Sequence, residues 1–489
     1  MAYSSRLIAR LMTGVWFTLI TFTFSALADP PVKDENYRAL IADFREEVRE
    51  FDQFTDHGKA LSPSVQKYIV RWEKWFEAGG KGPAPVLTFK GKRWRFDLKE
   101  RRAGVGAPSP VADLSKMNLG LKIRGLKSAM EDPELYVRSR IGTSTFDLFR
   151  DGKAKPVIFG GSVESWQKNA MEPGSIAYHV PSPYEEWGIS KFLVNNKNGS
   201  AEVAFVVPPI REYVLHHLAL VEYAGATEST GWLNEAERFA MRARFSEAMS
   251  SLPLDVREKI RKSWVTMGYA GVLREHPSVV ERIVAIESPL VDLEIFRLRD
   301  ETQIVALSSK LTLWGEGSAF LVESILPHRP LGVAFMGSAG YLLGDKTVYH
   351  FHAPKSFLDA GANLVSIESA NPEAVGKHLA VFSPLVETIE RVDEWIAKGI
   401  VSVDVEQSLV AKSIFQYNQA NGTNIRFSAW NLLTDLPASS YRDAHESFNL
   451  DNVNPELKKS AKREIVKDAV GFLVENHRVS CQTYLLPPT

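Results

Sequence analysis

The chain has 489 residues, of which 45% are hydrophobic and 24% are charged, so it is long enough for two or three packed domains and is not a disordered polymer. Its 58 Lys and Arg residues nearly balance its 59 Asp and Glu residues, which excludes a strong overall field favouring nucleic acid or an anionic membrane surface. Cys481 is its single cysteine, so the chain forms no internal disulfide and depends on packing for stability.

Residues 1–28 have the pattern of a secretory signal peptide. Arg6 and Arg10 precede an apolar run at 11–24, and the small-residue pattern Ala-Leu-Ala at 26–28 precedes Asp29. The alternative is an uncleaved membrane anchor, but the run is shorter than the roughly 20 residues that span a bilayer. We therefore expect cleavage after residue 28, export to the bacterial periplasm, and no stable membrane span in the mature protein.

Residues 29–265 predict a mainly helical N-terminal region of unknown role. Apolar residues at helical spacing indicate amphipathic helices at 40–51 and 65–76, followed by a Gly- and Pro-rich, linker-like stretch at 79–110. A strand is predicted at 201–207, where the next two residues are prolines that cannot donate to a sheet.

Two further helices are predicted in this region, at 213–223 and 235–249. His216 and His217 fall on the first of them, but adjacent residues of a helix point in different directions, so they do not predict a pair of metal ligands. No motif in this region indicates a particular chemistry. It could nevertheless carry the principal function, for example by binding a partner.

Residues 266–489 predict an α/β domain with a mixed or mostly parallel central sheet. From about residue 301, short apolar runs alternate with helical patterns, for example at 304–307, 331–336 and 425–433. In sheets of this kind, ligands usually bind at the carboxyl ends of the strands. Those ends are where the sequence places its glycine-rich and acidic motifs.

A first group of motifs is rich in glycine. Gly-Glu-Gly-Ser-Ala occupies 315–319, and Gly-Ser-Ala-Gly at 337–340 follows the predicted strand at 332–336. A glycine-rich turn exposes backbone N–H groups, so Gly337 and the hydroxyl of Ser338 could hold an anion such as phosphate. The structural alternative is an ordinary tight turn between a strand and a helix.

Three familiar sites are disfavoured by spacing. The glycines at 315 and 317 lack the third glycine of a dinucleotide fingerprint, and neither serine lies in the Gly-x-Ser-x-Gly pattern of a hydrolase nucleophile. His350 and His352 could point to one side of a strand, but no third ligand is near in sequence, so no metal site is predicted.

Taken in order, the motifs of the C-terminal part resemble those of the purine nucleoside phosphorylase and uridine phosphorylase superfamily, which includes nucleosidases. The glycine-rich pieces are followed by a Gly-Asp pair at 344–345, by Phe-Ser-Pro at 382–384 and by a helix through Trp395. Val-Asp-Val-Glu at 403–406 and Thr-Asp at 434–435 then resemble the family's Val-Asp-Met-Glu and Ser-Asp motifs. The resemblance implies a three-layer α/β domain with a mixed sheet, preceded by the mostly helical region.

The resemblance also assigns roles to residues. Glu406, next to Val405, would accept hydrogen bonds from the ribose 2′- and 3′-hydroxyls. Asp435 would be the general acid that protonates the leaving base. Phe382, with Val381 beside it, would lie against the base. Ser338 and Gly337 would bind phosphate or position the attacking water.

These roles imply an enzyme that cleaves the N-glycosidic bond of a small-molecule nucleoside by phosphorolysis or hydrolysis. Inorganic phosphate would be a co-substrate in the first case, and no other cofactor or metal is implied. Some relatives complete the pocket with a neighbouring subunit, so a homo-oligomer is plausible.

Two departures from the family pattern bear on activity. Val405 replaces the family's methionine, and the Gly-Asp-Pro loop that opens the phosphorylases has no clear copy. These departures motivate the alternative of a non-catalytic nucleoside-binding or scaffold protein that retains the fold. The structural alternatives for the residues are a helix cap for Glu406, a strand-end turn for Asp435 and a core position for Phe382.

Overall fold

A computed structural model describes most of the chain after residue 131. The described residues are 132–180, 188–288, 290–311, 313–343, 348–438 and 455–484, with Arg71, Lys74 and the short strands at 86–89, 92–95, 98–100 and 111–113. The predicted signal peptide, the helix at 40–51, nearly all of that at 65–76 and the Gly-Asp pair at 344–345 lie outside them. Among the described helices, none is long and apolar enough to cross a membrane.

The first unit of the structure is built on a seven-stranded sheet. Its strand order is β3-β6-β7-β8-β5-β9-β4, and β5 runs parallel to both of its neighbours. A separate hairpin pairs β1 (Val86–Phe89) with β2 (Lys92–Arg95). The sheet strands are β3 (Leu98–Glu100), β4 (Val111–Asp113), β5 (Lys155–Gly160), β6 (Ile176–Val180), β7 (Ser190–Asn195), β8 (Ala201–Val207) and β9 (Thr230–Asn234).

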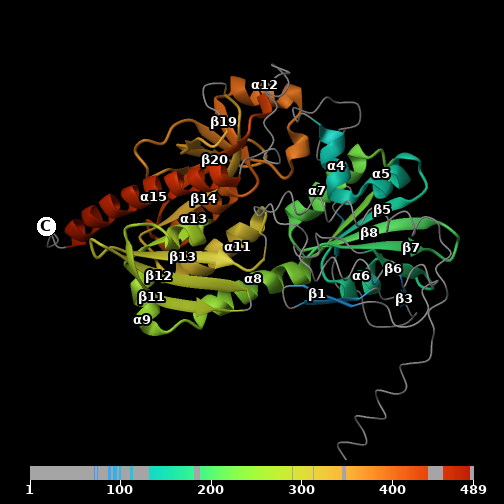
Figure 1. Cartoon of the computed structure of the whole chain (residues 1–489), viewed down its shortest axis with the longest axis horizontal. Helices are drawn as coiled ribbons and strands as arrows, with labels where there is room; N and C mark the ends of the chain where they lie inside the picture. The colour runs from blue at the N-terminus through green and yellow to red at the C-terminus, as the bar shows by residue number, and fades with distance from the viewer. Residues whose placement is uncertain are drawn as a thin grey trace, which may run out of the picture.

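Helices cover both faces of this sheet (Figure 1). On one face, α4 (Pro133–Ile141), α5 (Thr143–Arg150) and α7 (Arg211–Tyr223) contribute to one hydrophobic core. On the other face, α6 (Val163–Asn169) packs through Trp166 against Phe192 of β7. The predicted strand at 201–207 and helix at 213–223 are confirmed.

The prediction of a mainly helical region at 29–265 did not include most strands of the seven-stranded sheet that the described residues form beside their helices. The strands that it missed are short and covered on both faces, so their buried residues follow one another without the alternation that identifies a half-exposed strand. In β7, for example, Phe192, Leu193 and Val194 are consecutive and all buried. Such a run cannot be told from a buried helix by its period alone.

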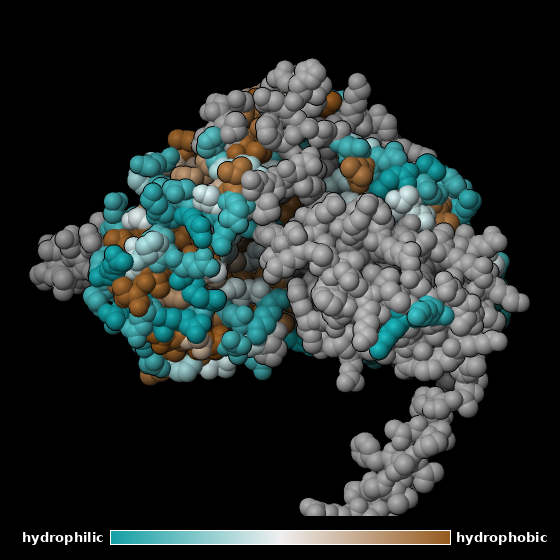
Figure 2. Space-filling model, in the orientation of Figure 1, coloured by the Kyte–Doolittle hydropathy of each residue, from teal (hydrophilic) through white to brown (hydrophobic). Residues whose placement is uncertain are grey.

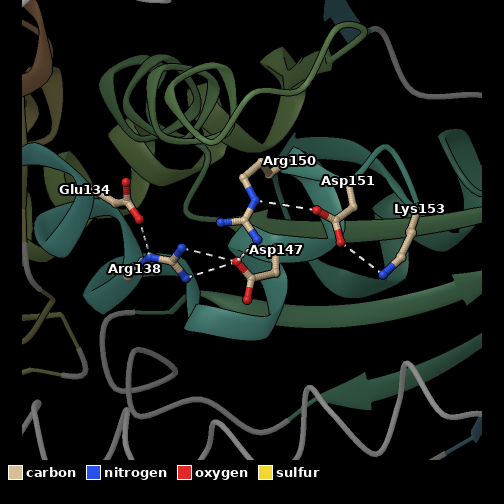
Figure 3. Close-up of polar contacts among 6 residues, drawn as sticks. All are labelled: Glu134, Arg138, Asp147, Arg150, Asp151 and Lys153. Atoms are coloured by element: carbon tan, nitrogen blue, oxygen red, sulfur yellow. Dashed lines mark hydrogen bonds and ion pairs between the residues drawn. The ribbon is translucent and has the colours of Figure 1, made fainter.

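Ion pairs fix the two short helices α4 and α5 to each other (Figure 3). Arg138 donates to Glu134 on its own helix and reaches Asp147 on α5 at 3.2 Å. Arg150 of α5 also approaches Asp147, at 2.9 Å. Because these side chains are partly or largely exposed, the pairs contribute little free energy individually, about 0.2–1 kcal/mol each. Their effect is to orient the helix pair that packs beside α7.

The second unit is built on an eleven-stranded mixed sheet, which confirms the predicted mixed α/β domain. Its main path is β11-β12-β13-β10-β14-β19-β18-β16-β17, with β20 beside β14 and β15 beside β20. The strands are β10 (Trp264–Met267), β11 (Val279–Glu287), β12 (Val291–Leu298), β13 (Gln303–Ser309), β14 (Gly332–Tyr341), β15 (Phe351–His352), β16 (Ser356–Leu358), β17 (Leu364–Glu368), β18 (Lys377–Ala380), β19 (Ile400–Asp404) and β20 (Arg426–Asp435).

Helices pack on both faces of this sheet, which gives the expected three layers. One core joins it to α8 (Glu235–Ser250), α9 (Leu254–Arg261), α11 (Glu316–Ile325) and α13 (Gln407–Asn421). Another joins it to α10 (Ala270–Arg274) and the long helix α15 (Pro455–Tyr484), which crosses β14 and β20 in Figure 1. Further helices are η2 (Leu326–His328), η3 (Pro384–Val386) and α12 (Ile389–Ala397).

The structure places the start of the second unit earlier than the sequence pattern predicted. The predicted boundary between residues 265 and 266 cuts β10, and α8 and α9 before it already pack in the second unit's core. The change of unit therefore falls near residue 234, between β9 and α8.

On the face of the second unit visible in Figure 2, hydrophobic side chains occur as separate patches among hydrophilic ones.

Candidate nucleoside site

The residues predicted to contact base and ribose lie together at the ends of β18 and β19. These two strands are parallel, so their carboxyl ends meet at one edge. The amide of Val381 donates to the carbonyl of Asp404 at 2.7 Å, which joins the segments that follow the two strands. Val381 and Val405 are buried in one core, and the half-buried Phe382 packs against it. The structure therefore brings these predicted residues together.

Glu406 stands at the N-cap position of α13, but its side chain makes no capping hydrogen bond. Capping falls to Asp404, whose carboxylate accepts from the amides of Glu406 at 3.0 Å and Gln407 at 3.1 Å. The Nε2 atom of the buried His378 lies 2.8 Å from the same carboxylate. The capping alternative for Glu406 thus does not describe its carboxyl.

Burial raises the pKa of Glu406 well above its ordinary value, and the negative charges of Asp404 and Glu212 raise it further. Glu212 belongs to α7 in the first unit, so the Glu406 carboxyl lies where the two units meet. A carboxyl in such surroundings loses its proton more readily when a ligand donates hydrogen bonds to it. The paired hydroxyls of a sugar are donors of that kind.

Asp435 ends β20 opposite Gly340, near the end of β14. Gly340 of β14 pairs with both Asp435 and Val403. A Cβ atom on Gly340 would come within 2.8 Å of the Asp435 Oδ2 atom and 3.2 Å of a Val403 methyl group, so a glycine is needed for this approach. Gly340 of β14 therefore lies between Asp435 and β19, the strand that leads to Glu406.

The carboxyl of Asp435 is in an environment that favours its protonated form. Burial raises its pKa, while the hydroxyl of Thr434, which donates to Oδ1 at 2.9 Å, opposes that shift. Burial also raises the pKa of the neighbouring Glu387 well above its ordinary value, and the charge of Asp435 adds to this. When two neighbouring carboxyls such as Asp435 and Glu387 are buried, the charge of one makes ionisation of the other less favourable.

The predicted turn at 337–340 is instead part of β14, which continues to Tyr341. Its residues pair with β20, from Gly337 opposite Asn431 to Gly340 opposite Asp435, so its amides do not form the anion-binding turn that was expected. The pairing was invisible in the sequence because β20 lies about ninety residues further along the chain. The exposed Ser338 still lies two residues before Gly340, and therefore on the same strand face.

Tyr269 closes the Ser338 end of the site. Its hydroxyl donates to the carbonyl of Gly337 at 3.0 Å and lies 3.4 Å from the Ser338 Oγ atom. It follows Gly268, where a Cβ atom would lie 1.9 Å from the carbonyl oxygen of Met336, so only glycine lets this loop cross β14. Ser338 and Gly337 thus share a neighbour that the sequence did not single out.

Helix α7 of the first unit adds side chains that the sequence analysis did not assign to the site. The Nδ1 atom of His216 lies 2.9 Å from the Ser383 Oγ atom, next to Phe382. Tyr213 stacks on Trp314, with ring centroids 5.6 Å apart, and burial followed by the charge of Glu406 raises its pKa. Tyr213 and His216 lie in a region without a recognised motif, so nothing in the sequence indicated that they belong to this site.

The second unit is thus an α/β domain with two carboxyls and a half-buried aromatic residue at its strand ends. No protein-family model and no curated protein matches the chain. Similar solved structures include futalosine hydrolase of Helicobacter pylori strain 26695, at 13% identity over 43% of this chain and 99% of that one, with a TM-score of 0.31.

Uridine phosphorylase from Vibrio fischeri ES114 is similar at 14% identity over 45% of this chain and 94% of that one, with a TM-score of 0.34. The 5′-methylthioadenosine/S-adenosyl homocysteine nucleosidase of Campylobacter jejuni is similar at 10% identity over 42% and 95%, with a TM-score of 0.32. At such identities a likeness concerns the fold, so function is inferred below from the side chains of this chain.

Proposed function

We propose that this protein is an enzyme that cleaves the N-glycosidic bond of a nucleoside, by phosphorolysis or by hydrolysis. The observation that carries the proposal concerns Asp435 and Glu406, two carboxyls with raised pKa values. Asp435 ends β20 and Glu406 follows β19, both of which pair with β14 at Gly340, and Phe382 follows β18 next to β19. Both kinds of reaction need a proton donor for the base and a carboxylate for the sugar. Phosphorolysis would use phosphate as its co-substrate, and hydrolysis would use water.

Asp435 is proposed as the general acid. Cleavage builds negative charge on the leaving base, and a protonated carboxyl that transfers its proton to a ring nitrogen neutralises that charge. Burial already raises the pKa of Asp435, which supports a protonated side chain before the reaction. The rate should therefore fall as the pH rises through this pKa, because the ionised carboxylate has no proton to give.

Glu406 is proposed to bind the ribose hydroxyls. Its carboxyl has two acceptor oxygens, no capping hydrogen bond to break, and a backbone amide held by Asp404. Phe382 is proposed to lie against the base, for which a half-buried ring is suited, with Val381 and Val405 behind it. Ser338 and Gly337 are proposed to position the phosphate or the attacking water beside Asp435.

The test is release of free base from a panel of purine and pyrimidine nucleosides, each assayed with and without phosphate. We expect release from at least one nucleoside, and a fall in kcat of about 10²- to 10⁴-fold for Asp435→Asn with a small change in KM. Asp300→Asn, in the turn between β12 and β13, is the matched control and should behave as wild type.

Three outcomes bear on this proposal. Dependence on added phosphate would identify a phosphorylase, whereas release without it would identify a hydrolase. If the folded wild-type protein released no base from any nucleoside, or if Asp435→Asn were as fast as wild type, the catalytic proposal would be wrong. Binding of a nucleoside without turnover would support the non-catalytic alternative instead.

We also propose that the protein is exported and cleaved after residue 28, as the pattern at 1–28 indicates. Sequencing the amino terminus of the protein purified from a periplasmic extract should find Asp29 first. Recovery of the uncleaved chain from the cytoplasm would contradict export.

A further inference from the structure

Helix α7 belongs to the first unit, yet it contacts both sides of the proposed nucleoside site. His216 lies one helical turn after Glu212 and Tyr213, and residues three or four apart project from the same helix face. His216 reaches Ser383 beside the base-contacting Phe382, at 2.9 Å. Tyr213 and Glu212 lie near Glu406, whose charge raises the pKa of Tyr213 and whose own pKa is raised by Glu212.

One half-exposed aromatic residue is held between these α7 side chains. Trp314 stacks on Tyr213 with the planes 19° apart, and the edge of the His216 ring meets it at a centroid distance of 4.7 Å. Tyr213 and His216 are buried, whereas Trp314 and Phe382 keep accessible surface against the same core. His216 therefore has Trp314 on one side and the Phe382 segment on the other.

We propose that Trp314 is a substrate-contact residue of the nucleoside site, positioned by Tyr213 and His216, so that α7 of the first unit builds part of the site of the second. This inference rests on the proposed function. It gives the first unit a role in binding, and it gives the site a second aromatic surface besides Phe382.

Two helices cap each other where the two units meet. Neither α7 nor α11 has a capping side chain of its own. The carboxylate of Glu212 accepts from the amide of Glu316 at 3.0 Å, and the carboxylate of Glu316 accepts from the amide of Arg211 at 2.9 Å. Arg238 of α8 adds a bidentate contact to Glu316, at 2.7 and 2.5 Å.

The glycine-rich motif at 315–319 is explained by this docking. A Cβ atom on Gly315 would lie 2.2 Å from the Glu212 Cγ atom, and one on Gly317 would lie 2.7 Å from a methyl group of Ile210. The glycines therefore let the first turn of α7 approach α11, rather than cradling an anion. Trp314 directly precedes Gly315, so the same contact fixes the backbone that carries the proposed substrate-contact ring.

The chemistry of this surface predicts the part of the nucleoside that it accepts. Burial, helped by the neighbouring His217 and Arg140, lowers the pKa of His216 well below its ordinary value, so its imidazole is neutral. Trp314 and Tyr213 are neutral as well. A surface built from neutral aromatic rings suits a flat base or an uncharged sugar substituent.

The experiment compares Trp314→Ala, Trp314→Phe and a matched control, Trp232→Phe, whose ring is half-buried on the far face of the first sheet. Loss of a stacking ring should raise KM about 5- to 150-fold in Trp314→Ala, with kcat much less affected. Nucleoside binding should quench tryptophan fluorescence in wild type and in Trp232→Phe, and the quench should be lost in Trp314→Phe.

The positioning role of His216 is tested separately. His216→Ala should raise KM because the Ser383 contact is lost, and His216→Asn should restore much of the affinity because its amide can again bond Ser383. A uniformly misfolded protein would not be rescued by that conservative change. Equal KM values in His216→Ala and wild type would overturn this positioning role.

Failure of this inference can be told apart from failure of the proposed function. If wild type releases base while Trp314→Ala has an unchanged KM and Trp314→Phe still shows the quench, the role of Trp314 is wrong and the activity stands. If wild type releases no base but the Trp314-dependent quench is present, the binding surface stands and the catalytic proposal fails.

Discussion

Replacing Gly315 by alanine is the sharpest perturbation of the contact between α7 and α11. Gly315 has φ 53° and ψ −125°, a conformation that residues with a Cβ atom adopt only under strain. The new methyl group would lie 2.2–2.4 Å from the Cγ, Cδ and Oε2 atoms of Glu212. Because Glu212 is buried, it cannot swing into solvent to make room.

The free energy of unfolding should fall by about 2–5 kcal/mol. About 1–3 kcal/mol comes from the strained backbone, and about 1–2 kcal/mol comes from loss of the hydrogen bond between the Glu212 carboxylate and the Glu316 amide. Gly422→Ala is the matched control. It also has a positive φ, of 60°, but has no atom within 4 Å of the new methyl group, so it should cost only about 1–2 kcal/mol.

Urea unfolding followed by tryptophan fluorescence measures both variants, and KM for base release reports on the site. We expect Gly315→Ala to unfold at the lower urea concentration and to have the higher KM, while Gly422→Ala keeps the wild-type KM. Equal stability losses in the two variants, with equal KM values, would refute the inference that α7 is clamped at Gly315.

Three further predictions concern the charged groups. Burial and the charge of Glu316 raise the pKa of Glu212 from 4.5 to about 7. The unfolded chain therefore ionises at a lower pH than the folded protein, and the free energy of unfolding should fall by up to about 3 kcal/mol as the pH rises from 4.5 to 7. Urea titrations at several pH values should show a smaller dependence on pH in Glu212→Gln. Arg238→Met leaves the Glu316 carboxylate without its bidentate partner and should lower the free energy of unfolding by about 2 kcal/mol; a change below about 0.5 kcal/mol would contradict that estimate. His378→Ala removes a buried partner of Asp404, so it should lower the free energy of unfolding by about 2 kcal/mol and raise KM. An unchanged KM would show that the pair of His378 and Asp404 does not help to place Glu406, the proposed ribose-binding residue.

Local features of the second unit follow from its sequence alone. Its short apolar runs predict the mixed α/β domain, and the resemblance of its motifs leads to Glu406 and Asp435 as the proposed site carboxyls. The helix at 213–223 is also predictable, because this stretch has no helix breaker and shows a helical period. These features depend on residues that are close together in the chain, so they can be predicted directly from the sequence.

The contacts of these segments depend on the tertiary fold. The predicted turn at 337–340 is strand because β20 pairs with it, and the first unit's strands were hidden because burial on both faces removes their alternation. The glycine at 315 was visible, but the Glu212 side chain that requires it comes from about a hundred residues earlier. Contacts between distant segments leave no period or spacing in one sequence, so the role of α7 beside the site could be inferred only from the fold.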